Sequence, residues 1–178
     1  VDLNISEDGK MLVFSKLSGS ALTNPHWGSN PGIYTYTLGE DHAEFVSERG
    51  RSPHFGPNKR IFATERIRTA TGRGSDDAAT DLISMTLDGK AIQTHATSPL
   101  ATVIQISPTG SHVAYREAGR LYAAALPATG RSVTLSSVAD IDSGPSAFAT
   151  ERISASGGEF IKWSRDGQAL TWSIGPRF

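Results

Sequence analysis

The chain has 178 residues and a hydrophobic content of 38%, which is typical of a globular protein. Its 17 basic and 18 acidic residues give a formal net charge of −1, so no strong field is available to attract nucleic acid or an anionic membrane. The absence of Cys excludes disulfide bonds and thiolate chemistry, and the apolar runs are too short to span a membrane.

The first unit, residues 1–48, predicts a four-stranded antiparallel sheet. Apolar and polar side chains alternate along its strands, and Asp8-Gly9 supplies the tight turn between the first two. A polar loop with Gly and Pro separates the second strand from the third, and it carries His26 and Trp27. These two side chains are candidates for contact with a partner or a ligand. The predicted strands are residues 1–6, 11–17, 32–38 and 43–47.

The second unit, residues 49–98, repeats this plan with Asn58 in the first turn. Asn accepts the left-handed backbone conformation that such a turn needs. His54 precedes Phe55 on the first strand of the unit, which is the innermost strand if the units surround an axis. It is therefore a candidate to face a central channel or a partner. The predicted strands are residues 52–56, 60–68, 80–87 and 90–97, the last two joined by a turn at Asp88-Gly89.

The remaining sequence contains a third unit, an irregular stretch and an incomplete fourth unit. The third unit spans residues 102–137, with strands predicted at residues 103–107, 112–117, 120–126 and 131–136. Residues 138–157 are rich in Ala, Ser and Gly and fall out of period, although an edge strand is expected at 150–153. The incomplete unit, residues 158–178, has two strands, 159–164 and 168–174, around a turn at Asp166-Gly167.

One hairpin pattern recurs in the four units: an apolar residue, Ser, any residue, Asp, Gly, and then an apolar strand that ends in an aromatic residue. The second unit is the poorest match, with Gly for Ser and Asn-Lys for Asp-Gly, and the third has Thr for Asp. Its turn positions lie at intervals of 50, 51 and 57 residues. A β-rich repeat of this length is typical of propeller blades with long loops, and the alternative is four unrelated hairpins in a β-sandwich. We interpret the turn residues as structural: Asp8, Gly9, Asn58, Gly110, Asp166 and Gly167.

This pattern resembles the repeat of TolB-like β-propellers, which are relatives of the WD-type blade. Residues 152–175 resemble more specifically the final blade of the propeller that precedes the catalytic domain in some bacterial amidohydrolases. The resemblance implies an all-β fold of about three and a half four-stranded antiparallel blades, a partial propeller. Because propellers close at about 4–8 blades, we expect a fragment of a longer polypeptide or one piece of an assembly.

The sequence offers no catalytic, cofactor-binding or metal-binding constellation. The five His residues never fall in the spacings of a local zinc site, so each is interpreted as a surface or strand-filling residue. No Gly-x-Ser-x-Gly nucleophile motif is present, and the Gly-rich stretches do not continue into phosphate-binding loops. Two groups of carboxylates could bind a hard cation such as Ca²⁺, but solvated loops are the favoured interpretation: Asp76, Asp77 and Asp81, and Asp140 and Asp142.

The leading functional hypothesis is a non-catalytic propeller segment of a larger bacterial hydrolase of the amidohydrolase type, acting as scaffold or access gate. In such a parent, a divalent metal such as zinc would belong to the catalytic domain. The alternatives are an independent TolB-like protein-binding propeller and the propeller of a prolyl-oligopeptidase-type or tricorn-type peptidase. The expected partners are the remaining blades or a domain of the parent polypeptide, or an assembly partner. The expected location is the periplasm or outside the cell, with the cytoplasm as alternative.

Overall fold

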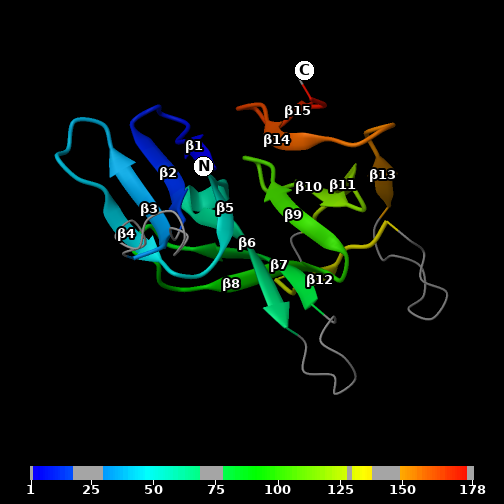
Figure 1. The fold of residues 1–178 in the computed structure, drawn as a ribbon, viewed down its shortest axis with the longest axis horizontal. Coiled ribbons are helices and arrows are strands. Elements are labelled where there is room, and N and C mark those ends of the chain that lie inside the picture. The colour runs from blue at the N-terminus through cyan, green and yellow to red at the C-terminus, as the bar shows by residue number, and fades with distance from the viewer. Residues whose placement is uncertain (1, 18–29, 69–77, 128–129, 138–148, 176–178) are drawn as a thin grey trace, which may run out of the picture.

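The regular structure of the chain is built from strands. The computed structural model describes residues 2–17, 30–68, 78–127, 130–137 and 149–175 (Figure 1). Within these ranges the strands form four sheets, none of them closed, and one 3-10 turn, η1 (Pro57–Lys59), is the helical element. The prediction of an all-β fold is confirmed.

The first sheet is a simple meander in which each strand pairs with the next along the chain. All its neighbouring strands are antiparallel, as predicted. The alternation of the sequence places Val13 and Ile33 on the buried side, whereas Phe14 and Tyr34 point to the opposite side. The strands are β1 (Leu3–Ile5), β2 (Met11–Lys16), β3 (Gly32–Thr37) and β4 (Glu44–Ser47).

The second sheet repeats the meander and gains one additional strand. Its four antiparallel strands are β5 (Arg51–Phe55), β6 (Ile61–Arg68), β7 (Ala78–Met85) and β8 (Gln93–Ser98). The additional strand is β12 (Val133–Thr134), which pairs in parallel with the outer edge of β8. The alternating pattern of the sequence predicts the four antiparallel strands to within three residues at each end, but it does not predict the parallel addition.

The third sheet differs from the sequence prediction in its fourth strand. Its order is β9 (Ala101–Ile106), β10 (His112–Glu117), β11 (Arg120–Ala125) and β13 (Thr150–Arg152). The prediction that residues 131–136 form its fourth strand is wrong, because Val133 and Leu135 are buried against the second sheet. The expected edge strand at 150–153 is confirmed, since β13 pairs with β11 and fills that position. The fourth sheet is the hairpin of β14 (Glu159–Trp163) and β15 (Leu170–Ser173).

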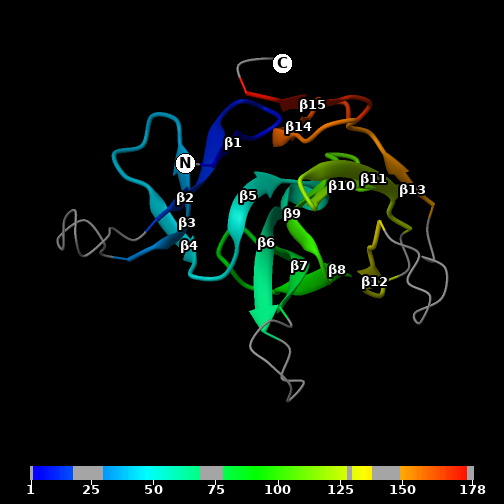
Figure 2. The same cartoon turned by 45° about the vertical axis from the view of Figure 1, so that its right-hand side comes forward.

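Three apolar clusters join the sheets in chain order. Val13 of the first sheet packs with Ile61 and Ile83 of the second, and Leu82 of the second packs with Tyr115 of the third. The third and fourth sheets meet through a smaller cluster of Ala114, Leu121, Ile161, Trp163 and Trp172. Figures 1 and 2 show the resulting arc, in which the sheets follow one another from blue to red. Antiparallel sheets that pack face to face in sequence order are compatible with a partial propeller.

Candidate functional site

The first strands of the four sheets converge on a cavity of about 280 Å³, which we call the axial cavity. Ser52 comes from β5, Gln105 from β9 and Lys162 from β14, and Asp2 directly precedes β1. Arg116 of β10 and Glu159 of β14 complete its polar wall. The cavity brings together residues that lie up to 160 positions apart in the sequence. A local sequence motif therefore could not predict it.

Backbone irregularities shape two strands of the cavity wall. The pairing of β5 with β6 shifts between Arg51 and His54, and Ser52 has a φ of 50°. The pairing of β14 with β15 shifts between Glu159 and Lys162, and Phe160 has a φ of 52°. A bulge turns side chains away from the regular alternation, so these shifts decide which side chains of β5 and β14 reach the cavity.

The polar wall carries charges of both signs: the basic groups Arg116 and Lys162 are partly buried, and the carboxylates Asp2 and Glu159 are exposed. Arg116 pairs with Glu159 at 3.4 Å through Nη1 and donates from Nε to the Thr102 hydroxyl at 3.0 Å. Asp2 accepts a hydrogen bond from the Ser52 hydroxyl at 2.8 Å. Lys162 donates from Nζ to the Leu3 carbonyl oxygen at 3.4 Å. Such a wall can recognise a polar ligand, because it places charges of both signs around one small space and two of them, Arg116 and Lys162, are partly buried.

His54 lies inside the interface between the second and third sheets, not on a channel surface as the sequence led us to expect. Its ring is 4% exposed. Nε2 accepts a hydrogen bond from the Ile106 amide at 3.0 Å, and Nδ1 lies 3.2 Å from the Ser52 carbonyl oxygen. These partners require a neutral ring with the proton on Nδ1. Burial lowers the pKa of His54 to about 4, which agrees with a neutral ring at pH 7.

The other candidates for partner or cation contact are mostly outside the described residues. This applies to His26 and Trp27, and equally to Asp76, Asp77, Asp140 and Asp142. Asp81 is described, and its carboxylate is almost fully buried and accepts a hydrogen bond from the Thr97 hydroxyl at 2.7 Å. The described residues contain no group of three or more His, Asp or Glu placed to hold a metal ion.

Two of the predicted turn residues, Asp8 and Asp166, sit in nearly identical networks. Asp8 Oδ1 accepts from the Ser6 hydroxyl at 2.6 Å and from the Lys10 amide at 3.0 Å, and Gly9 has a φ of 73°. Asp166 accepts from the Ser164 hydroxyl and the Gln168 amide at the same two distances, and Gly167 has a φ of 70°. In both turns the Ser hydroxyl lowers the pKa of the carboxyl most strongly.

Gly110 repeats the turn geometry of Gly9 and Gly167, whereas the second unit forms a different turn in which Asn58 and Lys59 are both left-handed. Asn58 has a φ of 59° inside η1, and Gly110 has a φ of 77°. Thr109 stands in the Asp position of the third unit, where its hydroxyl lies 3.0 Å from that of Ser107. The same network also occurs in the outer hairpin of the second sheet, where Thr86 donates to Asp88. The turn at Asp88-Gly89 is predictable from the sequence, but its Thr-Asp hydrogen bond becomes visible only in the structure.

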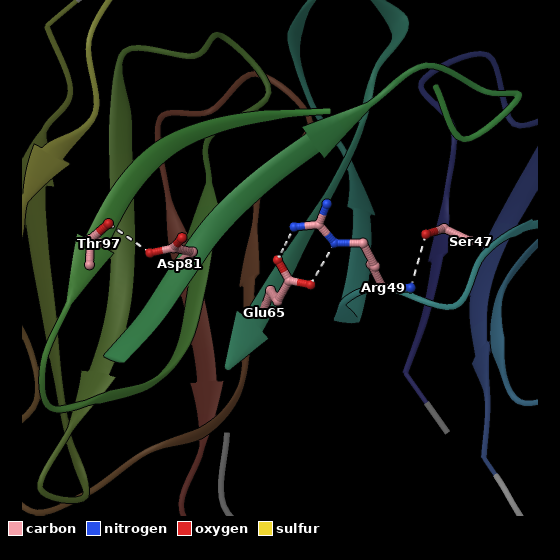
Figure 3. Close-up of polar contacts among 5 residues, drawn as sticks. All are labelled: Ser47, Arg49, Glu65, Asp81 and Thr97. Atoms are coloured by element: carbon pink, nitrogen blue, oxygen red, sulfur yellow. Dashed lines mark hydrogen bonds and ion pairs between the residues drawn. The ribbon is translucent and has the colours of Figure 1, made fainter. Parts of the chain in front are cut away.

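A polar cluster ties the first two sheets together (Figure 3). Arg49, between β4 and β5, donates from Nε and Nη2 to the Glu65 carboxylate at 2.8 and 2.6 Å. Glu65, Asp81 and Thr97 are cross-strand partners on β6, β7 and β8. The hydrogen bonds that Arg49 donates to Glu65, the charge of Glu65 and then the charge of Asp81 raise the pKa of Arg49. The main chain of Arg49 is fixed as well, because its amide donates to the Ser47 hydroxyl at 2.9 Å.

The structure contains a Ser–His contact, between Ser84 and His95, that was not predicted from the sequence. The Ser84 hydroxyl lies 2.7 Å from His95 Nε2 and accepts a hydrogen bond from Arg60 Nε at 2.8 Å. Pairing of β7 with β8 across the Asp88 turn could have revealed it, because diagonal neighbours on one face come within reach. Ser84 is fully buried, so this pair has no access to a substrate and acts as an internal hydrogen bond.

Comparison of the sequence with protein-family models finds no matching family, and comparison with curated proteins finds no similar protein. Among the described residues, no helix is long and apolar enough to cross a membrane.

Proposed function

We propose that this chain is a non-catalytic, propeller-like scaffold that packs a further β-sheet of a larger protein against its first sheet. The observation that carries this proposal is an apolar row across the first sheet. Leu3, Phe14, Tyr34 and Phe45 are successive cross-strand partners on β1 to β4. We call this row, together with Ile5 of β1, the aromatic face.

The aromatic face is ordered but exposed. Phe14 and Tyr34 stack with ring centroids 6.0 Å apart, and the edge of Phe45 meets Tyr34 at 5.4 Å. Leu3, Ile5 and Phe45 are each 50% exposed. Contiguous apolar surface of this kind marks interaction sites on soluble proteins, and rings already held by one another lose little conformational freedom when a partner covers them.

The corresponding faces of the other three sheets are covered by the preceding sheet. Leu12 occupies the same position in the first sheet as Ile61, Val113 and Leu170 occupy in the other three. In each sheet this residue pairs with the last residue of the sheet's first strand. Ile61 packs against the first sheet, Val113 against the second and Leu170 against the third. In all three interfaces this face is covered by an antiparallel sheet. We therefore expect another antiparallel sheet to cover the aromatic face.

The turn glycines support the same conclusion. A Cβ atom at Gly167 would meet Thr109 Cγ2 of the preceding turn at 3.2 Å, and one at Gly110 would meet Pro57 Cγ of the preceding turn at 2.9 Å. A Cβ atom at Gly9 would meet nothing within 4 Å. The first turn therefore offers the open side that the later turns have filled, on the sheet that also exposes the aromatic face.

The larger protein in this proposal is a bacterial metal-dependent hydrolase of the amidohydrolase type, located in the periplasm or outside the cell. The support is the resemblance of the Asp-Gly repeat and of residues 152–175, together with the open arc of sheets. In that setting the arc supports or gates a catalytic domain, and any divalent metal belongs to the other domain.

Site-specific cross-linking in the native full-length protein tests this function. A photoreactive amino acid in place of Phe45 should cross-link to a β-sheet segment of a polypeptide that carries an amidohydrolase-type domain. The same residue in place of Lys90, on an exposed turn, serves as control and should give no such product. Absence of a cross-link from position 45, or equal products from both positions, contradicts the proposal. A product with a separate β-sheet protein, or with a serine-peptidase polypeptide, would favour one of the two alternative functions.

A further inference from the structure

We propose that the axial cavity binds a zwitterion of amino-acid or dipeptide size. The carboxylate of this ligand lies toward Lys162 and Arg116, and its ammonium group lies toward Asp2 and Glu159. The site is separate from the aromatic face, because the two share no lining side chain. The inference therefore does not depend on the proposed scaffold role.

The balance of charges on the cavity wall favours a ligand that carries both signs. Two cations and two carboxylates line the same small space. A simple anion would approach both carboxylates and a simple cation would approach both basic groups, so each would gain attraction and repulsion together. A zwitterion can place each charge beside its opposite, and the partly buried Lys162 and Arg116 gain most from such pairing.

Lys162 is the anchor for the ligand carboxylate. Its ammonium group is partly buried and reaches the Leu3 carbonyl oxygen at 3.4 Å, a long contact for a hydrogen bond. Burial lowers the pKa of Lys162, and the charge of Asp2 opposes that effect. A carboxylate in the cavity would provide a charged acceptor, and charge-assisted hydrogen bonds are shorter and stronger than those to neutral carbonyls.

The two wall carboxylates are exposed, each accepts one hydrogen bond from the wall, and both keep capacity for a ligand ammonium group. Asp2 accepts a hydrogen bond from the Ser52 hydroxyl at 2.8 Å, and Glu159 accepts one from Arg116 Nη1 at 3.4 Å. An ionised carboxylate offers about four acceptor positions. Each of these contacts uses one of them, so both groups can accept further hydrogen bonds from an ammonium group.

The size and lining of the cavity limit the ligand further. Its volume of about 280 Å³ lies just below the range of about 300–1,000 Å³ for drug-sized ligands. Pro53, Val103 and Ile161 add an apolar portion to the wall, which fits a short aliphatic side chain. A free amino acid and a dipeptide share this chemistry, and the experiment separates them.

Titration of the 178-residue chain at pH 7, followed by backbone amide NMR, tests the inference. The probes are L-valine and L-alanyl-L-alanine, compared with two analogues of L-valine that each lack one charge, 3-methylbutanoate and 2-methylpropan-1-amine. At least one zwitterion should bind about tenfold or more tightly than either analogue, with shift changes at residues 159–162. The stronger of the two zwitterions identifies the source. Equal binding of zwitterions and analogues, or no saturation by either zwitterion below about 10 mM, overturns the inference.

A pair of matched variants checks the anchor. Lys162→Met removes the charge but keeps the length of the side chain, and it should weaken zwitterion binding about tenfold or more. Lys90→Met makes the same change on an exposed turn that does not line the cavity, and binding should stay unchanged. Wild-type affinity in Lys162→Met contradicts the assignment. If that variant fails to fold, the comparison of L-valine with its analogues on the wild-type chain still decides.

Discussion

His54 joins two sheets through Nε2, while Nδ1 bonds within its own strand. Its first partner, the carbonyl oxygen of Ser52, lies two residues away, but the second, the amide of Ile106, lies 52 residues away. The sequence therefore places a His on an innermost strand, but it does not show that the ring is buried between β5 and β9. The turn carboxylates Asp8 and Asp166 were predictable, because all of their partners lie within a few residues.

The buried ring predicts a loss of stability in mild acid. Because the folded-state pKa of His54 is about 4 and the ordinary value is 6.5, the unfolded chain binds the proton first. The stabilisation is complete above about pH 6.5 and decreases as the pH falls toward 4, by about 3 kcal/mol in all. Urea unfolding of wild type and His54→Gln at pH 7, 5 and 4 measures this contribution as the difference between their pH dependences.

His112→Gln is the control for that experiment, because His112 is exposed. It should follow the pH dependence of wild type, whereas His54→Gln should lose less stability between pH 7 and pH 4. An identical pH dependence in wild type and His54→Gln would show that the ring does not restrict protonation in the folded protein.

At the scale of single elements, hairpins were predictable and long-range strand pairing was not. Period-two alternation and the turns at Gly9, Gly110 and Gly167 locate β1 with β2, β9 with β10 and β14 with β15, since each hairpin is specified within about fifteen residues. The short strand β12 is specified instead by the burial of Val133 and Leu135 against β8. Its partner lies about 37 residues earlier, and nothing in the local pattern indicates a parallel pairing.

Two turn glycines with the same backbone conformation should respond differently to substitution. Gly9 and Gly89 have φ values of 73° and 76°, so an Ala at either position costs about 1–2 kcal/mol in backbone strain. A Cβ atom at Gly9 meets nothing, whereas one at Gly89 collides with the Val46 carbonyl oxygen of β4. Gly89→Ala must displace β4, and overpacking of this kind adds about 1–3 kcal/mol.

Denaturant unfolding of the two variants separates strain from collision. Gly9→Ala serves as the matched control, and Gly89→Ala should be the less stable by the cost of moving β4. Equal destabilisation of both variants would mean that the turn of Gly89 is not packed against the first sheet. The comparison therefore reports on the contact between the outer hairpin of the second sheet and β4.

At the scale of the whole molecule, the repeated sheets were predictable from the sequence, but the meeting of their side chains at the axial cavity was not. The turn spacing gave the number and order of the sheets, because each copy carries its own signal. The axial cavity depends on side chains from Asp2 to Lys162 and on shifted pairing at Ser52 and Phe160. These irregularities arise from packing between sheets, which no single repeat encodes.

The exposed aromatic face predicts that the isolated chain associates with itself through the first sheet. Apolar surface that normally contacts another sheet will find any available partner at sufficient concentration. Phe45→Ser removes a 50% exposed ring from this face and should shift association to higher concentration in sedimentation velocity experiments. Phe160→Ser removes a 74% exposed ring from the fourth sheet and should leave association unchanged. Because both variants lose an exposed Phe, general hydrophobicity would affect them alike, and only docking at the aromatic face would separate them.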